Sequence, residues 1–229
     1  MLVAVAANFA GPMQKIAAAF EADTKDTVKV VVGSTGAFYT QIKTGAPFDV
    51  FLSADADTPA QLESDGFTVP GRRFTFAYGR LVLWSARPDY IDARGDILLG
   101  ATFGKIAIAD PKLAPYGRAA VETMQRLGVY DTLRPKIVKA GNIGQAYQYV
   151  ATGNAPLGFV ALSQVVVDGK LAEGSAWVVP LSMHTPLRQD AVLLKHGANN
   201  AAASRFLEYL KGGKARRIIA AYGYDLSAN

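Results

Sequence analysis

Short apolar runs of strand length alternate along the chain with segments whose apolar residues recur at helical spacing. The first apolar runs cover residues 2–6, 28–32 and 49–52. Each is followed by a turn of small or polar residues and then by a segment that predicts a helix, at residues 12–22, 37–44 and 59–64. Strands that alternate with helices favour a parallel sheet with helices on both faces, so the pattern predicts an α/β fold.

This pattern is interrupted twice. Residues 74–78 and 81–84 are apolar stretches on either side of Gly79-Arg80 without helical period, and residues 189–195 form a second long strand near the end. Between these interruptions strands are predicted at 106–109, 136–140 and 157–160, with one helix ending at 127 and another over 145–152; helices at 201–210 and 215–221 close the chain. A chain that leaves a lobe once and returns once makes that lobe discontinuous. We therefore predict one lobe from residues 1–79 and 189–229, an inserted lobe from residues 80–188, and a ligand cleft between them.

Composition supports a folded globular chain. Of the 229 residues, 50% are hydrophobic and 19% are charged, a balance that excludes disorder as the main state. The chain has no cysteine, which excludes a disulfide scaffold, a thiolate zinc site and a cysteine nucleophile. No apolar run approaches the roughly 18 residues that a membrane-spanning helix needs. The sequence begins directly with an apolar strand, so we expect any export signal to have been removed.

Charge and residue types argue against two other classes of protein. The net charge is +5, but the basic residues are scattered, and we interpret Lys211, Lys214, Arg216 and Arg217 as the solvated face of a terminal helix rather than a nucleic-acid site. His184, Asp190 and Ser163 or Ser182 supply the residue types of a hydrolytic triad, but the chain has no Gly-x-Ser-x-Gly elbow. Its two histidines and scattered carboxylates have no metal-ligand spacing. We expect neither an enzyme, nor a resident cofactor or metal, nor a nucleic-acid partner.

The candidate chemistry lies in four turns between a predicted strand and a predicted helix. They contain Asn8, Thr35, Tyr116 and Ile143, each at or beside the start of a helix. In a parallel sheet such turns share the carboxyl edge of the strands, where helix starts offer unpaired N–H groups and about half a positive charge. The side chains of Asn8, Ser34, Thr35 and Tyr116 add donors, and Arg118 is the only cation beside these turns. The pattern predicts a site for a small, fully ionised oxyanion, although Asn8 and Thr35 taken singly could be ordinary helix caps and Tyr116 a packing residue.

Longer segments resemble a known family over essentially the whole chain. They are Ala6–Phe9, Gly33–Gly36, Thr44–Asp55, Asp110–Pro111 followed by Ala114–Gly117, and Ala155–Val160. Together they look like the periplasmic molybdate-binding proteins of ABC importers. The resemblance implies a two-lobed type II periplasmic binding protein fold, each lobe a mostly parallel sheet flanked by helices. It also implies molybdate or tungstate as ligand, the membrane permease of an ABC importer as partner, a monomer, and a periplasmic location.

Carried over by position, the resemblance implies a set of ligand contacts. These are Asn8, Thr35, Tyr116 and, through its backbone N–H, Ile143, with Ala7, Ser34, Gly36 and Gly117 as possible additions. Molybdenum is then held only through its oxygens, without a direct protein ligand. Many relatives have a tyrosine where this chain has Ala161, and Tyr116 resembles the tyrosine of another branch of the family, which could replace it. Sulfate, phosphate, chromate or an organic acid in the same cleft is the alternative ligand.

Overall fold

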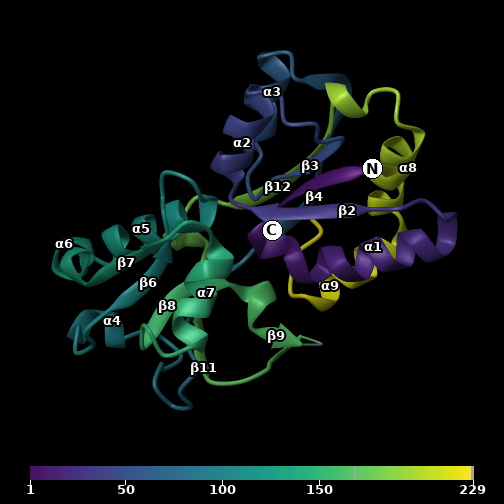
Figure 1. Ribbon diagram of the computed structural model, residues 1–229. Coiled ribbons are helices and arrows are strands. Elements are labelled where there is room, and N and C mark those ends of the chain that lie inside the picture. The colour runs from purple at the N-terminus through teal and green to yellow at the C-terminus, as the bar shows by residue number, and fades with distance from the viewer. Residues whose placement is uncertain (168, 228–229) are drawn as a thin grey trace. The chain divides into compact units, whose positions relative to one another are not determined.

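The computed structural model describes residues 1–167 and 169–227. Contacts divide the chain into two compact units. Unit 1 comprises Met1–Tyr78 and Arg188–Asn229, and unit 2 comprises Gly79–Leu187. The beginning and the end of the chain, purple and yellow in Figure 1, therefore belong to the same unit.

Unit 1 is built on a five-stranded sheet in the order β2-β1-β3-β12-β4. Its strands are β1 (Leu2–Ala6), β2 (Lys29–Gly33), β3 (Val50–Leu52), β4 (Thr68–Gly79) and β12 (Leu187–Leu194). Strand β1 runs parallel to both β2 and β3, whereas β12 runs antiparallel to β3. The helices are α1 (Ala10–Thr24), α2 (Thr35–Lys43), α3 (Asp57–Ser64), α8 (Ala201–Lys211) and α9 (Gly213–Ala221).

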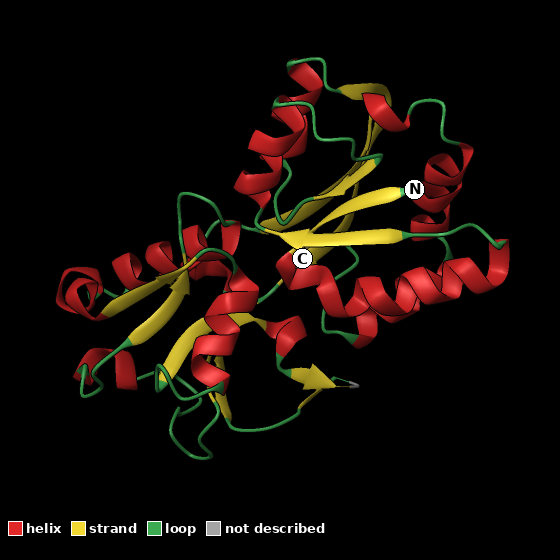
Figure 2. Cartoon of the chain, viewed as in Figure 1, coloured by secondary structure: helices red, strands yellow, loops and turns green. Residues whose placement is uncertain are grey.

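The two faces of this sheet are buried in different apolar clusters. Val3 and Val5 of β1 pack in the cluster that holds the apolar side chains of α1, α8 and α9, whereas Ala4 packs with Phe38 and Ile42 of α2. Successive residues of a strand point to opposite faces, so a strand buried on both faces has to be apolar throughout. Figures 1 and 2 show the corresponding helices on either side of the sheet.

Unit 2 contains a second five-stranded sheet, in the order β11-β5-β8-β6-β7, and a short hairpin of β9 and β10. The strands are β5 (Leu81–Ser85), β6 (Ile106–Ala109), β7 (Ile137–Ala140), β8 (Leu157–Ala161), β9 (Val166–Val167), β10 (Lys170–Leu171) and β11 (Ser175–Val178). The helices are α4 (Ile97–Gly100), α5 (Pro115–Arg126), α6 (Tyr130–Leu133) and α7 (Ile143–Ala151). Strand β6 is parallel to β7 and β8, and β5 is antiparallel to β8 and β11.

The described residues also form five short 3-10 helices, at Ala7–Phe9, Arg134–Lys136, Leu162–Gln164, Leu181–Met183 and Lys195–Gly197. The expected α/β architecture is present, but each sheet is mixed: three strands run parallel, and the strands next to the unit boundaries add antiparallel pairs. Two helices that matter for the site begin two residues earlier than predicted, at Thr35 and Ile143. The predicted turn after β1 is instead a 3-10 helix that leads directly into α1 at Ala10.

Two ion pairs on the surface of unit 1 join α1 and the turn after it to α8 and α9. Arg205 donates to both oxygens of Asp26, at 2.8 and 2.9 Å, and Lys214 Nζ lies 2.8 Å from Asp23 Oδ2. The hydrogen bond from Arg205 lowers the pKa of Asp26, and the hydrogen bond from Lys214 lowers the pKa of Asp23.

From these two ion pairs we expect the folded protein to become less stable as the pH falls. A carboxyl whose pKa is lowered by folding takes up its proton at a higher pH in the unfolded chain than in the folded protein. Its contribution to the free energy of unfolding is therefore complete above about pH 4 and is lost as the pH falls through the lowered pKa of the folded protein. We expect the free energy of unfolding in urea to decrease between about pH 5 and pH 3. In an Asp26→Asn variant the decrease should be smaller, and an equal decrease would show that the Asp26 pair contributes nothing.

Candidate functional site

Three turns of unit 1 meet at the carboxyl edge of its parallel strands. The register pairs Ala6 at the end of β1 with Gly33 of β2, and Val5 of β1 with Leu52 of β3. The residues that follow these strands are therefore neighbours: the 3-10 helix Ala7–Phe9, the start of α2, and the segment Ser53–Asp55. Five residues of these turns were expected as ligand contacts or possible additions, and three of them, Asn8, Ser34 and Thr35, are at most 5% exposed.

A hydrogen-bond network determines what the Thr35 hydroxyl can do. Thr35 Oγ1 accepts from the Ala54 N–H at 3.1 Å and lies 3.4 Å from Ser53 Oγ. Ser53 Oγ donates its only hydrogen to Asp55 Oδ1, at 2.9 Å. Thr35 is thus the member of the Thr35–Ser53 contact that has a hydrogen to give, and this hydrogen is held only by a long bond. The Thr35 hydroxyl can turn this hydrogen toward an anion at little cost.

The start of α2 has the features of an anion site rather than of a capped helix. Ser34 is the N-cap residue in extended conformation, and its side chain makes no capping hydrogen bond. The first intrahelical bond of the turn runs from the Phe38 N–H to the Ser34 carbonyl, at 3.1 Å. The N–H groups of Thr35 and Gly36 precede it and have no acceptor within the helix. The alternative interpretation, an ordinary side-chain cap at the start of α2, therefore does not apply to Ser34 or Thr35.

Asn8 is positioned differently from the prediction. Its side-chain amide donates one hydrogen to Gln189 Oε1 and the other to the Tyr224 hydroxyl, both at 2.9 Å. Both amide hydrogens are therefore used inside unit 1, and a contact of the Asn8 side chain with the ion stays a prediction. The first residues of the 3-10 helix, Ala7 and Asn8, can contribute backbone N–H groups instead.

The other two expected ligand positions lie at the equivalent edge of unit 2. The register pairs Ala109, the last residue of β6, with Ala140, the last residue of β7. After these strands the chain enters α5, where Tyr116 is the second residue, and α7, where Ile143 is the first. Both residues therefore lie at helix starts that follow adjacent strands, as the sequence predicted. The Tyr116 side chain is buried.

Gly117 brings the start of α5 close to the end of β6. A Cβ atom at this position would lie 2.2 Å from the Ala109 carbonyl oxygen and 2.9 Å from the Pro111 nitrogen. The Gly117 N–H already donates to the Ala114 carbonyl at 3.0 Å. Gly117, considered as an additional donor, therefore acts through the close packing that it permits and not through its N–H.

Side chains also hold the start of α7. Asn142 is a true cap, because its Oδ1 accepts from the Gln145 N–H at 3.0 Å. Gln164 accepts from the Ala161 N–H at 2.9 Å and donates to the Ile143 carbonyl at 3.1 Å. The backbone at Ala161 is thus tied to the helix start at Ile143.

The sequence did not single out several of these supporting residues. Ser53 and Asp55 belong to a segment that was noted only for its resemblance, and their place directly after a buried strand is the signal that could have revealed them. Gln189 and Tyr224 carry no local signal, because each acts on Asn8, far away along the chain. Gln164 acts both on Ala161, three residues before it, and on Ile143, 21 residues before it.

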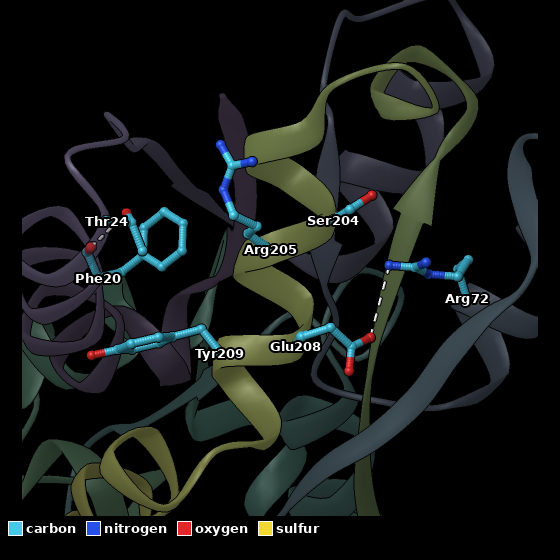
Figure 3. A pocket seen from close by; sticks show the side chains of 7 residues that line it. All are labelled: Phe20, Thr24, Arg72, Ser204, Arg205, Glu208 and Tyr209. Carbon is cyan, nitrogen blue, oxygen red and sulfur yellow. Dashed lines mark hydrogen bonds and ion pairs between the residues drawn. The ribbon is translucent and has the colours of Figure 1, made fainter.

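Other features of the described residues suit an anion less well. A hollow of about 430 Å³ beside α8 is lined by the rings of Phe20 and Tyr209 and by polar and charged side chains. Among these, Arg72 Nη2 lies 3.8 Å from Glu208 Oε1 (Figure 3). His184 Nδ1 lies 2.8 Å from its neighbour's carbonyl, and His196 Nδ1 lies 3.0 Å from Asp49 Oδ1. Residues 1–167 and 169–227 contain no cluster of three or more side chains able to hold a metal ion. Among them, no helix is both long and apolar enough to cross a bilayer.

Comparison with known proteins gives the family. Residues 1–225 match the family described as bacterial extracellular solute-binding protein. The chain belongs to this family. Its relatives include the molybdate-binding protein ModA of Azotobacter vinelandii, which is 55% identical over 98% of this chain and 89% of its own length. The ModA protein of Rhodobacter capsulatus is 54% identical over 98% of this chain and 87% of its own length.

Solved structures of solute-binding proteins agree with this assignment. The periplasmic molybdate-binding protein of Azotobacter vinelandii superimposes with a TM-score of 0.96 and 42% identity, and the match covers 100% of both chains. The substrate-binding domain of a putative molybdenum ABC transporter from Clostridium difficile has a TM-score of 0.72 and 25% identity, over 100% of this chain and 99% of its own. The fold is that of the two-lobed type II periplasmic binding proteins, as predicted.

Proposed function

We propose that this solute-binding protein binds molybdate or tungstate and passes the ion to the membrane subunits of an ABC importer. The observation that carries the proposal is its 55% identity, over 98% of the chain, to a protein described as molybdate-binding. The donor-rich helix starts in each unit support it independently, because they offer the hydrogen bonds that an oxyanion needs.

The proposed ligands are neutral donors. In unit 1 they are backbone N–H groups near Asn8 and Thr35, with Ala7 and Gly36 as neighbours, and the hydroxyls of Ser34 and Thr35. In unit 2 they are the start of α5 at Tyr116 and the N–H of Ile143. We propose that both donor sets act on the same ion. A hydrogen bond to a charged group is worth about 1.5 to 3 kcal/mol net, so roughly six or seven of them can offset the lost hydration of a dianion.

Selectivity follows from the size and the protonation of the ion. Backbone donors at helix starts adapt little, so a smaller tetrahedral anion such as sulfate leaves stretched hydrogen bonds. A protonated phosphate brings a hydroxyl hydrogen that needs an acceptor, which a set of N–H donors does not offer. Molybdate and tungstate are nearly equal in size, so we expect the site to bind both.

A panel of oxyanions tests this function. Binding is measured by titration calorimetry, and thermal unfolding is recorded with molybdate, tungstate, chromate, sulfate and phosphate. A ligand present at a hundredfold excess over its Kd stabilises the folded state by about 2.7 kcal/mol. We expect a large rise in Tm with molybdate and tungstate and little with sulfate or phosphate. Equal shifts with sulfate would remove the selectivity, and no binding of molybdate would refute the function.

We further propose that the protein works as a monomer in the periplasm. The family description as extracellular supports this compartment, and so does the periplasmic relative with a TM-score of 0.96. The membrane partner is the permease of the importer. Size-exclusion chromatography with light scattering, with and without molybdate, checks the monomer: a mass near 24.3 kDa is expected in both conditions.

A further inference from the structure

Asn8 is the centre of a buried hydrogen-bond network that reaches two distant parts of unit 1. Its amide nitrogen donates to Gln189 on β12 and to Tyr224 near the C-terminus, both at 2.9 Å. The Tyr224 hydroxyl in turn donates to the main-chain carbonyl of Asn8, at 2.8 Å. None of the three side chains is more than 5% exposed, so the hydrogen bonds are shielded from water.

The direction of each hydrogen bond in this network is determined by proton counting. A phenol has one hydrogen, and that of Tyr224 goes to the Asn8 carbonyl. Tyr224 can therefore only accept from the Asn8 side chain, so the atom facing it has to be the amide nitrogen. One hydroxyl thus holds both the main chain and the side chain of Asn8.

Tyr224 is itself held in place by packing and by backbone pairing. Its ring contacts Phe9 edge-on, with centroids 5.5 Å apart, and Phe9 contacts Phe76 in the same way at 4.8 Å. The next residue, Asp225, exchanges backbone hydrogen bonds with Tyr78 at 2.8 and 3.1 Å. The phenol oxygen is therefore a rigid support for the 3-10 helix Ala7–Phe9.

We propose that Tyr224 and Gln189 are positioning residues for the anion, and that the Asn8 side chain is a brace rather than a ligand. They hold the 3-10 helix so that its backbone N–H groups point toward the ion beside the start of α2. This inference rests on the proposed function, because it concerns the same ion.

Tyr224→Phe is the direct test. The substitution removes one oxygen and keeps the ring that packs on Phe9, so the variant should fold. We expect the Kd for molybdate, measured by calorimetry, to rise about tenfold, since the N–H donors of the turn lose their alignment. Tyr222→Phe is the matched control, because the Tyr222 ring lies over Lys15, at 5.0 Å, and it should leave the Kd within about twofold.

A double-mutant cycle separates a brace from a ligand. If the Asn8 side chain acts through Tyr224, Asn8→Ala should weaken binding clearly less in the Tyr224→Phe background than in the wild type. If the side chain contacts the ion, the two effects should be additive, and the inference is overturned. A Tyr224→Phe variant that unfolds more easily without ligand but keeps the wild-type Kd also overturns it, because the role is then structural only.

The outcomes also distinguish this inference from the function on which it rests. A wild-type protein that does not bind molybdate refutes the proposed function. If the wild type binds molybdate and the Tyr224→Phe variant has the same Kd, the function is left intact and only the positioning role is refuted.

Discussion

Replacing Gly117 with alanine is expected to weaken molybdate binding by more than a hundredfold and to destabilise the protein. The added methyl group meets the Ala109 carbonyl oxygen at 2.2 Å, a backbone atom that cannot rotate away. The start of α5 has to move away from β6, and the backbone at Tyr116 moves with it. Losing one or two charge-assisted hydrogen bonds costs about 3 kcal/mol, which corresponds to roughly a hundredfold in Kd.

The affinity of the Gly117→Ala variant is measured by calorimetry and its stability by urea unfolding without ligand. Overpacking at such a contact typically costs about 1 to 3 kcal/mol of stability. Gly104→Ala is a control in the same unit, because a Cβ there meets no atom within 4 Å. We expect the control to bind as the wild type does. Unchanged binding in Gly117→Ala would mean that the start of α5 does not contribute to the ion site.

The course of the backbone could be predicted from the sequence because most strands are buried on both faces. In β1, the four residues from Val3 to Ala6 are all buried and all apolar, and such a run is recognisable without any knowledge of the fold. Whether a strand runs parallel or antiparallel to its neighbour cannot be recognised from its apolar residues in this way. The last four residues of β12, 191–194, are as apolar and as buried as β1, yet β12 runs antiparallel to β3, and nothing in this apolar run indicates its direction.

The candidate site could be predicted in part for a similar reason. Turns that follow parallel strands have to lie at one edge of the sheet, so the meeting of the turns after β1 and β2, and of those after β6 and β7, was implied by the alternation itself, although the register was not. What the side chains do at that edge depends on contacts over long separations. Asn8 binds residues 181 and 216 positions away, so the partners of its side-chain amide could not be predicted from its own turn.

The buried ion pair of Asp190 predicts the largest effect on stability. The Asp190 side chain is 1% exposed and connects β12 to β4: Oδ2 lies 2.7 Å from Arg73 Nη1, and Oδ1 accepts from Thr75 Oγ1 at 2.7 Å. Arg73 also binds Glu63 at 3.0 Å. Asp190→Ala removes both acceptors and leaves Arg73 with a single partner. Breaking a fully buried pair from one side costs about 3 to 5 kcal/mol. Because Arg73 is 27% exposed and keeps Glu63, we expect a loss at the lower end of this range in urea unfolding.

Two further variants test whether the Asp190 carboxylate is the cause of the lost stability. Asp26→Ala removes an exposed, solvent-screened pair and should cost far less stability. Asp190→Asn, which keeps one acceptor oxygen, should be intermediate between wild type and Asp190→Ala. The Ser53 N–H binds the Asp190 backbone carbonyl at 3.0 Å, a contact that alanine keeps. The folded Asp190→Ala protein should therefore bind molybdate with nearly the wild-type Kd. An Asp190→Ala variant that is no less stable than Asp26→Ala would contradict this account, because water and Glu63 would then be enough to compensate the Arg73 charge.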